Sequence, residues 1–315
     1  MNRFTKAIQN IDTLQRKNIT LGFFYAIIKK YGQDNGGYQS AIITYYGLLS
    51  LFPLLIVFTS FTQLLLKNNY ALRNRIATSA TRYFPVIGNQ LQHSIHSPKE
   101  AGLALIASLL ITLYGARGVA SAFQHSLNSL WYIPQFKQPP FLKNVLRGLS
   151  IITIGGLGLL TTSLLSGYIA TLGHDFFIKI IATLASLLLL WVVLIYLFKL
   201  AVAGNKHIHQ VMVGAAIAAI GLQILQTLGG IIMSRELKEL NSLYGTFALV
   251  IGLLFWIYLQ VEVILYAVEI DVIRAYHLFP RSLQGSLTES DKAAYIKYTK
   301  STTQRINEKT FVKFE

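Results

Sequence analysis

Long apolar segments separated by short charged ones dominate the chain. A helix of about 20 apolar residues crosses the hydrocarbon core of a bilayer. Segments of that length or more cover residues 38–66, 101–130, 149–172, 176–198, 211–233 and 241–274. The last is the clearest, since no charge falls between Leu240 and Val261. The pattern predicts an all-α, polytopic membrane protein with six transmembrane helices.

The segments on either side of this domain are more polar. Residues 1–37 form a cytoplasmic or interfacial amino-terminal segment, 38–274 the transmembrane domain, and 275–315 a polar cytoplasmic tail. Within the first segment Leu21, Phe24, Ile28 and Tyr31 recur at helical spacing. They predict an amphipathic helix that lies at the membrane surface or packs as an ordinary helix against the protein.

Composition supports the membrane class. The chain is 53% hydrophobic and 13% charged, against about 25% charged in average globular proteins. The net charge of +15 would suit a nucleic-acid-binding protein, but the charges lie between the spans and in the tails. That placement favours retention of cytoplasmic loops, and no nucleic-acid partner is expected. Cysteine is absent, which excludes disulfides and thiolate metal sites.

The distribution of positive charge predicts the orientation. With six spans both termini lie on one side, and that side holds 19 of the 28 Lys and Arg residues. The positive-inside rule therefore places both termini in the cytoplasm.

Polar side chains recur inside three of the spans at helical spacing, so each set shares one face. The second span carries Arg117, Ser121, Gln124 and Asn128; the sixth carries Tyr258, Glu262, Tyr266 and Glu269; the first carries Tyr46, Ser50 and Pro53. Ionisable residues inside a membrane are costly and suggest function.

Arg117 lies 16 residues beyond Ala101 and Glu262 lies 16 residues beyond Thr246, in two spans that both enter from the far side. At about 1.5 Å per residue both would reach the same depth, in the cytoplasmic half. We therefore expect them to pair, and we expect a polar cavity lined by the first, second and sixth spans. The alternative is a buried ion pair without a cavity.

Sequence motifs of catalysis are missing. The chain has no phosphate-binding loop, no nucleophile elbow and no His-x-His-x-Asp-His cluster. We therefore expect neither an enzyme nor a bound cofactor or metal.

Four stretches resemble the YihY/BrkB family of bacterial inner-membrane proteins: AIITYYGLLSLFPLLIVF (41–58), LYGARGVASAFQHSLNSLW (113–131), VGAAIAA (213–219) and the sixth span from 242 to 270. The resemblance covers residues from about 20 to 275. It implies six transmembrane helices in the bacterial cytoplasmic (inner) membrane. Ala267-Val268-Glu269 replaces the family's usual Gly-Ala-Glu but keeps the acid. Members were once labelled ribonuclease BN, a label regarded as a misassignment, and others are associated with serum resistance or envelope lipid export.

Three functions follow from these observations. The first is a transporter or flippase-like protein for an amphiphilic or anionic, lipid-like envelope solute, with membrane lipids as partners. Arg117 would meet the anionic group, while Glu262 and Glu269 would neutralise it or carry protons. The second is a non-catalytic membrane scaffold held by a buried pair. The third is the ribonuclease of the old label.

Overall fold

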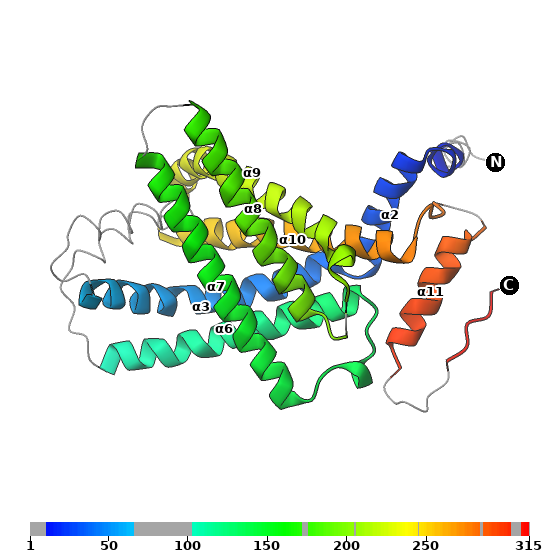
Figure 1. Cartoon of the computed structure of the whole chain (residues 1–315), viewed down its shortest axis with the longest axis horizontal. Helices are drawn as coiled ribbons and strands as arrows, with labels where there is room; N and C mark the ends of the chain where they lie inside the picture. The colour runs from blue at the N-terminus through cyan, green and yellow to red at the C-terminus, as the bar shows by residue number, and fades with distance from the viewer. Residues whose placement is uncertain are drawn as a thin grey trace.

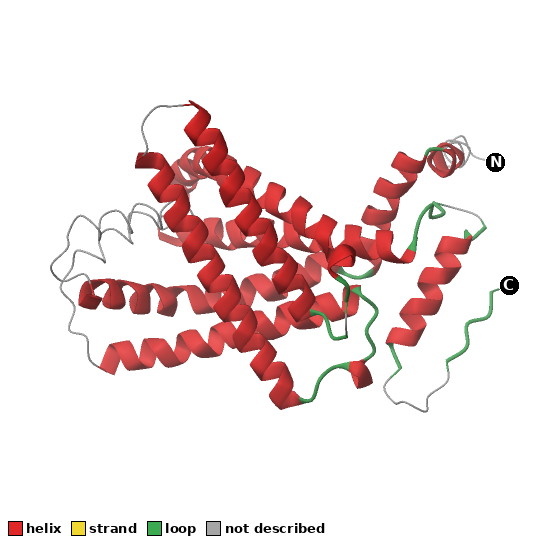
Figure 2. Cartoon of the chain, viewed as in Figure 1, coloured by secondary structure: helices red, strands yellow, loops and turns green. Residues whose placement is uncertain are grey.

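All regular secondary structure that the structure describes is helical (Figure 2). It is a computed structural model that describes residues 11–65, 103–171, 176–204, 206–244, 246–283, 286–303 and 310–314. Its elements, in chain order, are α2 (Ile19–Gln33), α3 (Gly36–Leu65), α6 (Leu103–Leu130), the 3₁₀ helix η2 (Gln135–Lys137), α7 (Phe141–Thr171), α8 (Phe176–Ala201), α9 (Ile208–Tyr244), α10 (Thr246–Tyr276) and α11 (Glu289–Ser301).

Three stretches within these helices are long and apolar enough to cross a membrane. They are Ile180–Ala201, Ile208–Gly229 and Val250–Tyr276, with mean hydropathies of 2.7, 1.9 and 1.9. In the most apolar part of each of these three stretches, only 28–33% of the residues are buried inside the protein. Much of their apolar surface therefore points outward. Apolar surface of that extent is stable only against lipid. The chain is therefore a helical membrane protein, and three of the predicted crossings meet the criterion for a span.

The long helices pack as neighbouring pairs. α9 packs along α10, α3 along α6 and α7 against α8, while α10 also contacts α3 (Figure 1). Glycines allow the close approaches: Gly118 of α6 faces the ring of Tyr46, and Gly214 of α9 faces the backbone of α10 at Ala267. Small residues at such contacts are how membrane helices reach close packing.

Two predicted helix boundaries are wrong. α7 begins at Phe141, eight residues before the expected start at Leu149. Pro140 immediately precedes it, and proline suits a helix start because its missing N–H would be unpaired there anyway. α9 runs on to Tyr244, through the polar stretch 235–239 that separates the predicted spans 211–233 and 241–274. Its Glu, Leu and Lys residues are strong helix formers. Residues 67–100, between the first two predicted spans, and His174, between the third and the fourth, lie outside the described residues.

The segment after α10 docks back onto α2. Asp291, at the start of α11, pairs with Arg281 at 2.7 Å and with Lys29 of α2 at 3.0 Å. Burial raises the pKa of Asp291, but hydrogen bonds from Ser282, Arg281 and Lys29 lower it by more, so it lies well below its ordinary value. Asp12 accepts a hydrogen bond of 2.7 Å from the backbone N–H of Leu283. These polar contacts hold the predicted tail against the amino-terminal helices.

Candidate functional site

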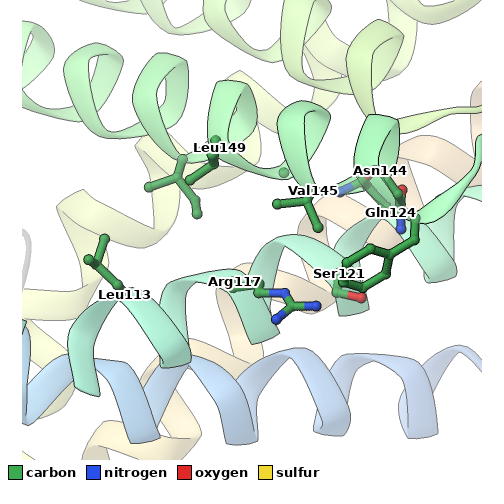
Figure 3. A pocket seen from close by; sticks show the side chains of 10 residues that line it. Leu113, Arg117, Ser121, Gln124, Asn144, Val145 and Leu149 are labelled. Carbon is green, nitrogen blue, oxygen red and sulfur yellow. The ribbon is translucent and has the colours of Figure 1, made fainter. Parts of the chain in front are cut away.

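A groove of about 310 Å³ lies between α6 and α7 (Figure 3). Its lining residues are Leu113, Arg117, Ser121, Gln124, Phe141, Asn144, Val145, Gly148, Leu149 and Ile152. The amides of Gln124 and Asn144 lie together toward one end, and Leu113 and Leu149 lie toward the other, with Arg117 between them (Figure 3). The groove is thus polar at one end and apolar at the other.

Arg117 is the only charged residue that lines this groove, and its side chain is exposed. Its guanidinium carbon lies 5.2 Å from the centre of the Phe141 ring, within range of a cation–π contact. It forms no ion pair with any residue that the structure describes. Arg117 lies midway along α6, about 20 Å from either end. A lone cation is therefore exposed at mid-helix depth.

The expected pair between Arg117 and Glu262 does not form. Glu262 instead accepts a hydrogen bond of 2.5 Å from the hydroxyl of Tyr31, which comes from α2. The rings of Tyr31 and Tyr266 stack with centroids 3.9 Å apart. The hydroxyl of Tyr258 lies beside Gly37, close to Glu262. The polar face of α10 thus faces α2, a helix that the sequence did not connect with it.

Glu269 belongs to a second, fully buried cluster. The ammonium of Lys30 lies 2.5 Å from a carboxylate oxygen of Glu269 and 2.5 Å from one of Asp34. It also donates to the carbonyl of Leu130 at 3.1 Å and lies 4.8 Å from the centre of the Tyr132 ring. The cluster joins α2, α10 and the end of α6.

The charges in this cluster are strongly coupled. Burial lowers the pKa of Lys30, but the carboxylates of Glu269 and Asp34 raise it by more, so the ammonium stays charged. Burial raises the pKa of Tyr132 to about 12, so its ring stays neutral beside the cation. One cation therefore faces two carboxylates in a site with no exposed surface on Lys30 or Glu269.

Sequence reasoning did not identify Lys30 or Asp34. Their i, i+4 spacing within a predicted helix is an available signal for a local ion pair. Glu269 lies 239 residues from Lys30, and no local pattern links the two. Tyr31, by contrast, was expected on the apolar face of this helix and is instead buried against α10.

The remaining predicted residues take three different places. Ser121 and Gln124 line the α6–α7 groove. Asn128 is buried and its side-chain oxygen accepts a hydrogen bond from the backbone N–H of Ala203 at 2.6 Å. Tyr46 and Ser50 pack against Gly118 and Gly115 of α6.

α3 continues as a helix through Pro53, whose side chain lies outside the described part. The described residues therefore divide the single predicted cavity among the α6–α7 groove, the α2–α10 contact and the α3–α6 interface. A polar stripe on one helix fixes which side chains share a face, but here each stripe meets a different neighbour.

Carboxylates elsewhere in the described bundle also have structural partners. Asp271 of α10 accepts a hydrogen bond from the backbone N–H of Gly214 at 2.7 Å. Among the described residues no group of three or more His, Cys, Asp or Glu side chains could hold a metal ion.

Fold and sites together define a helical membrane protein with buried charges and apolar outer surfaces. Over residues 27–291 the chain matches the family described as Virulence factor BrkB. It belongs to that family, as the motifs in the first, second, fifth and sixth predicted spans indicated.

Curated relatives are distant. A UPF0761 membrane protein of Psychrobacter sp. (strain PRwf-1) is 24% identical over 88% of this chain and 53% of its own length. One from Alcanivorax borkumensis is 25% identical over 84% of this chain and 62% of its own. The chain thus spans little more than half the length of these two relatives. The putative ribonuclease-like protein YfkH of Bacillus subtilis is 26% identical over 80% of this chain and 95% of its own. No solved structure matches.

Proposed function

We propose that this chain is a six-span protein of the bacterial inner membrane that moves an anionic, lipid-like amphiphile by a transporter or flippase-like mechanism without an enzymatic step. Both termini would lie in the cytoplasm. The observation that carries the proposal is the exposed Arg117 in the groove between α6 and α7, which has no ion-pair partner in the described part of the chain.

The charge of Arg117 favours an anionic ligand. A guanidinium inside a transmembrane span, where the six-span proposal places Arg117, is costly unless it meets an anion or water. No carboxylate among the described residues pairs with it. Phosphate is a fitting partner, because the planar guanidinium can donate two parallel hydrogen bonds to its oxygens. The side-chain amides of Gln124 and Asn144 supply further donors at the same groove.

The apolar part of the groove favours an amphiphile over a small anion. Leu113 and Leu149 are about half exposed, and Ile152 lines the same groove. The acyl chain of a lipid could lie on these apolar side chains, while the headgroup of the same lipid reached Arg117. This separation of polar and apolar ends matches the build of a phospholipid.

Lipid exchange between leaflets tests the proposal. Purified protein in vesicles would be compared with empty vesicles, using fluorescent phosphatidylglycerol and phosphatidylcholine and a membrane-impermeant quencher. We expect the protein to accelerate exchange of the anionic lipid above the zwitterionic one. Arg117→Gln should reduce this rate about tenfold or more, since a charged hydrogen bond contributes about 1.5–3 kcal/mol.

Lys143→Gln is the matched control, because Lys143 is an exposed cation in the first turn of α7 that does not line the groove. Equal rates for Arg117→Gln and wild type, or no lipid exchange by wild type, would reject the proposal.

A membrane scaffold is the second candidate, and the buried Lys30–Glu269 contact favours it. It predicts a stable protein that exchanges no lipid. The ribonuclease activity suggested by the name of YfkH is separable from both, since it predicts metal-dependent RNA cleavage by the purified protein.

A further inference from the structure

α2 exposes large apolar side chains along part of its length while it buries a charged one. Ala26, Ile27 and Lys30 are buried, and so is Tyr31 near the carboxyl end of the helix. Leu21, Phe24 and Ile28 are exposed by 52%, 60% and 65%. We call these three residues the α2 apolar face. Large apolar side chains exposed together mark a surface that contacts something other than water.

The rotation of α2 is fixed, so this face cannot turn inward. Lys29 donates to the carbonyl of Ser282 at 2.5 Å and pairs with Asp291. Lys30 and Tyr31, the next two residues, bond to Glu269 and Glu262 of α10. Contacts to two separate elements thus fix the rotation of the carboxyl end of α2.

The same bonds give the depth of α2. The span Val250–Tyr276 ends seven residues beyond Glu269 and 14 beyond Glu262. At 1.5 Å per residue, Lys30 and Tyr31 reach α10 about 10 Å and about 21 Å inside the end of that span. The carboxyl end of α2 therefore lies alongside a membrane-spanning helix, within its apolar length.

From that point α2 runs outward. In Figure 1 it rises away from the line of α3 and α10, on the side of the molecule where α11 lies. Ile28 is nearest to its deep end, and Phe24 and Leu21 follow toward the outside. Asp34 and Asn35 are the only residues between α2 and α3, and α3 exposes Tyr38 and Tyr45 shortly after the turn. Exposed aromatic side chains therefore follow the α2 apolar face along the chain.

We propose that α2 is an oblique helix embedded in the phospholipid leaflet on the side of α11, with Leu21, Phe24 and Ile28 among the acyl chains. Depth decreases from Ile28 to Leu21 and on to Leu14, which is 62% exposed in the preceding helical segment. Amphipathic helices bind the headgroup–acyl boundary in this way. Contact along the flank of a span favours lipid over a second copy of the chain. This inference is independent of the transport proposal.

The absence of cysteine makes the test direct. Single variants Leu14→Cys, Leu21→Cys, Phe24→Cys and Ile28→Cys would be nitroxide-labelled in full-length protein in phosphatidylethanolamine–phosphatidylglycerol vesicles. Electron paramagnetic resonance then compares the accessibility of each label to oxygen, which concentrates in lipid, and to a water-soluble nickel chelate. Leu188→Cys, in the span of α8, is the lipid reference, and Tyr298→Cys, exposed on α11, is the water reference.

We expect the oxygen-to-nickel ratio at position 28 to approach that at 188, and to fall severalfold through 24 and 21 to 14. A ratio equal to that at 298 at all four positions would place α2 in water and overturn the proposal. Labels at 24 and 28 that are immobile and closed to both reagents would show a protein contact and would overturn it equally. All four side chains are exposed, so labelling leaves the core intact, and circular dichroism of each variant checks this.

Discussion

Replacing Lys30 with methionine should destabilise the protein far more than replacing its partner Glu269 with glutamine. The wild-type cluster holds one cation and two carboxylates, at Lys30, Asp34 and Glu269. Lys30→Met leaves two buried carboxylates facing each other without a cation. Glu269→Gln leaves a neutral Lys30–Asp34 pair and keeps an oxygen that can accept from Lys30.

The magnitude follows from the burial. Lys30 and Glu269 have no exposed side-chain surface, and removing one partner of such a pair costs about 3–5 kcal/mol. Glu269→Gln replaces an ion pair with a hydrogen bond from the charged ammonium to a neutral oxygen, and Asp34 still pairs with Lys30, so we expect a loss of about 1 kcal/mol. In the double variant the loss should be smaller than the sum of the two single losses, because only one buried carboxylate remains without a cation.

Unfolding by sodium dodecyl sulfate in mixed micelles, followed by far-ultraviolet circular dichroism at pH 7, measures these differences. Lys143→Met, at an exposed site on α7, should shift the free energy of unfolding by no more than about 0.5 kcal/mol. Equal costs for the two single variants at positions 30 and 269, or strict additivity in the double, would refute the account of an uncompensated buried charge.

Three further outcomes are expected. Because folding lowers the pKa of Asp291, the stability that its carboxylate contributes is present above its unfolded pKa near 3.8 and is lost as pH falls toward the folded value. At pH 7 Asp291→Asn should therefore expose α11 to protease. Unchanged digestion would contradict this. Gly214→Ala should lower the free energy of unfolding by about 1–3 kcal/mol in the same micelle titration, since the added Cβ would collide with the backbone of α10. Gly156 has open space around it, so Gly156→Ala should leave the free energy of unfolding unchanged. Asn128→Leu should cost about 1–3 kcal/mol by leaving the buried N–H of Ala203 unpaired; a thermal midpoint equal to that of wild type would argue against this bond.

Arg117 shows where reasoning from a helical stripe stops. The spacing of Arg117, Ser121 and Gln124 puts them on one face of α6, and all three line the groove between α6 and α7. It does not say which helix forms the other wall. α7 supplies it, and its early start at Phe141 provides the ring that lies over the guanidinium. The equal depth expected for Arg117 and Glu262 did not predict a contact between them. Depth gives the position of a side chain along the bundle axis, but it does not say toward which neighbouring helix the side chain points.

Glu269 and Asp291 illustrate the same limit for charges. Each was visible in the sequence as an acid, one in a span and one in a polar tail. Their partners, Lys30 and Lys29, are adjacent residues of α2. Contacts that close loops of more than 200 residues have no local signature, so the docking of the tail onto α2 was not predictable.

The sequence by itself determined that this chain is helical and belongs in a membrane, because hydropathy and helix length are properties of contiguous residues and act within one segment. It also indicated the family, through motifs in four spans. Only the tertiary structure decided which neighbour each polar face meets: Glu262 and Glu269 face α2, Arg117 faces the groove along α7, and Tyr46 faces a glycine of α6. The physical reason is that helix rotation and pairing are set by the packing of the whole bundle, where small residues permit contact and buried charges require partners.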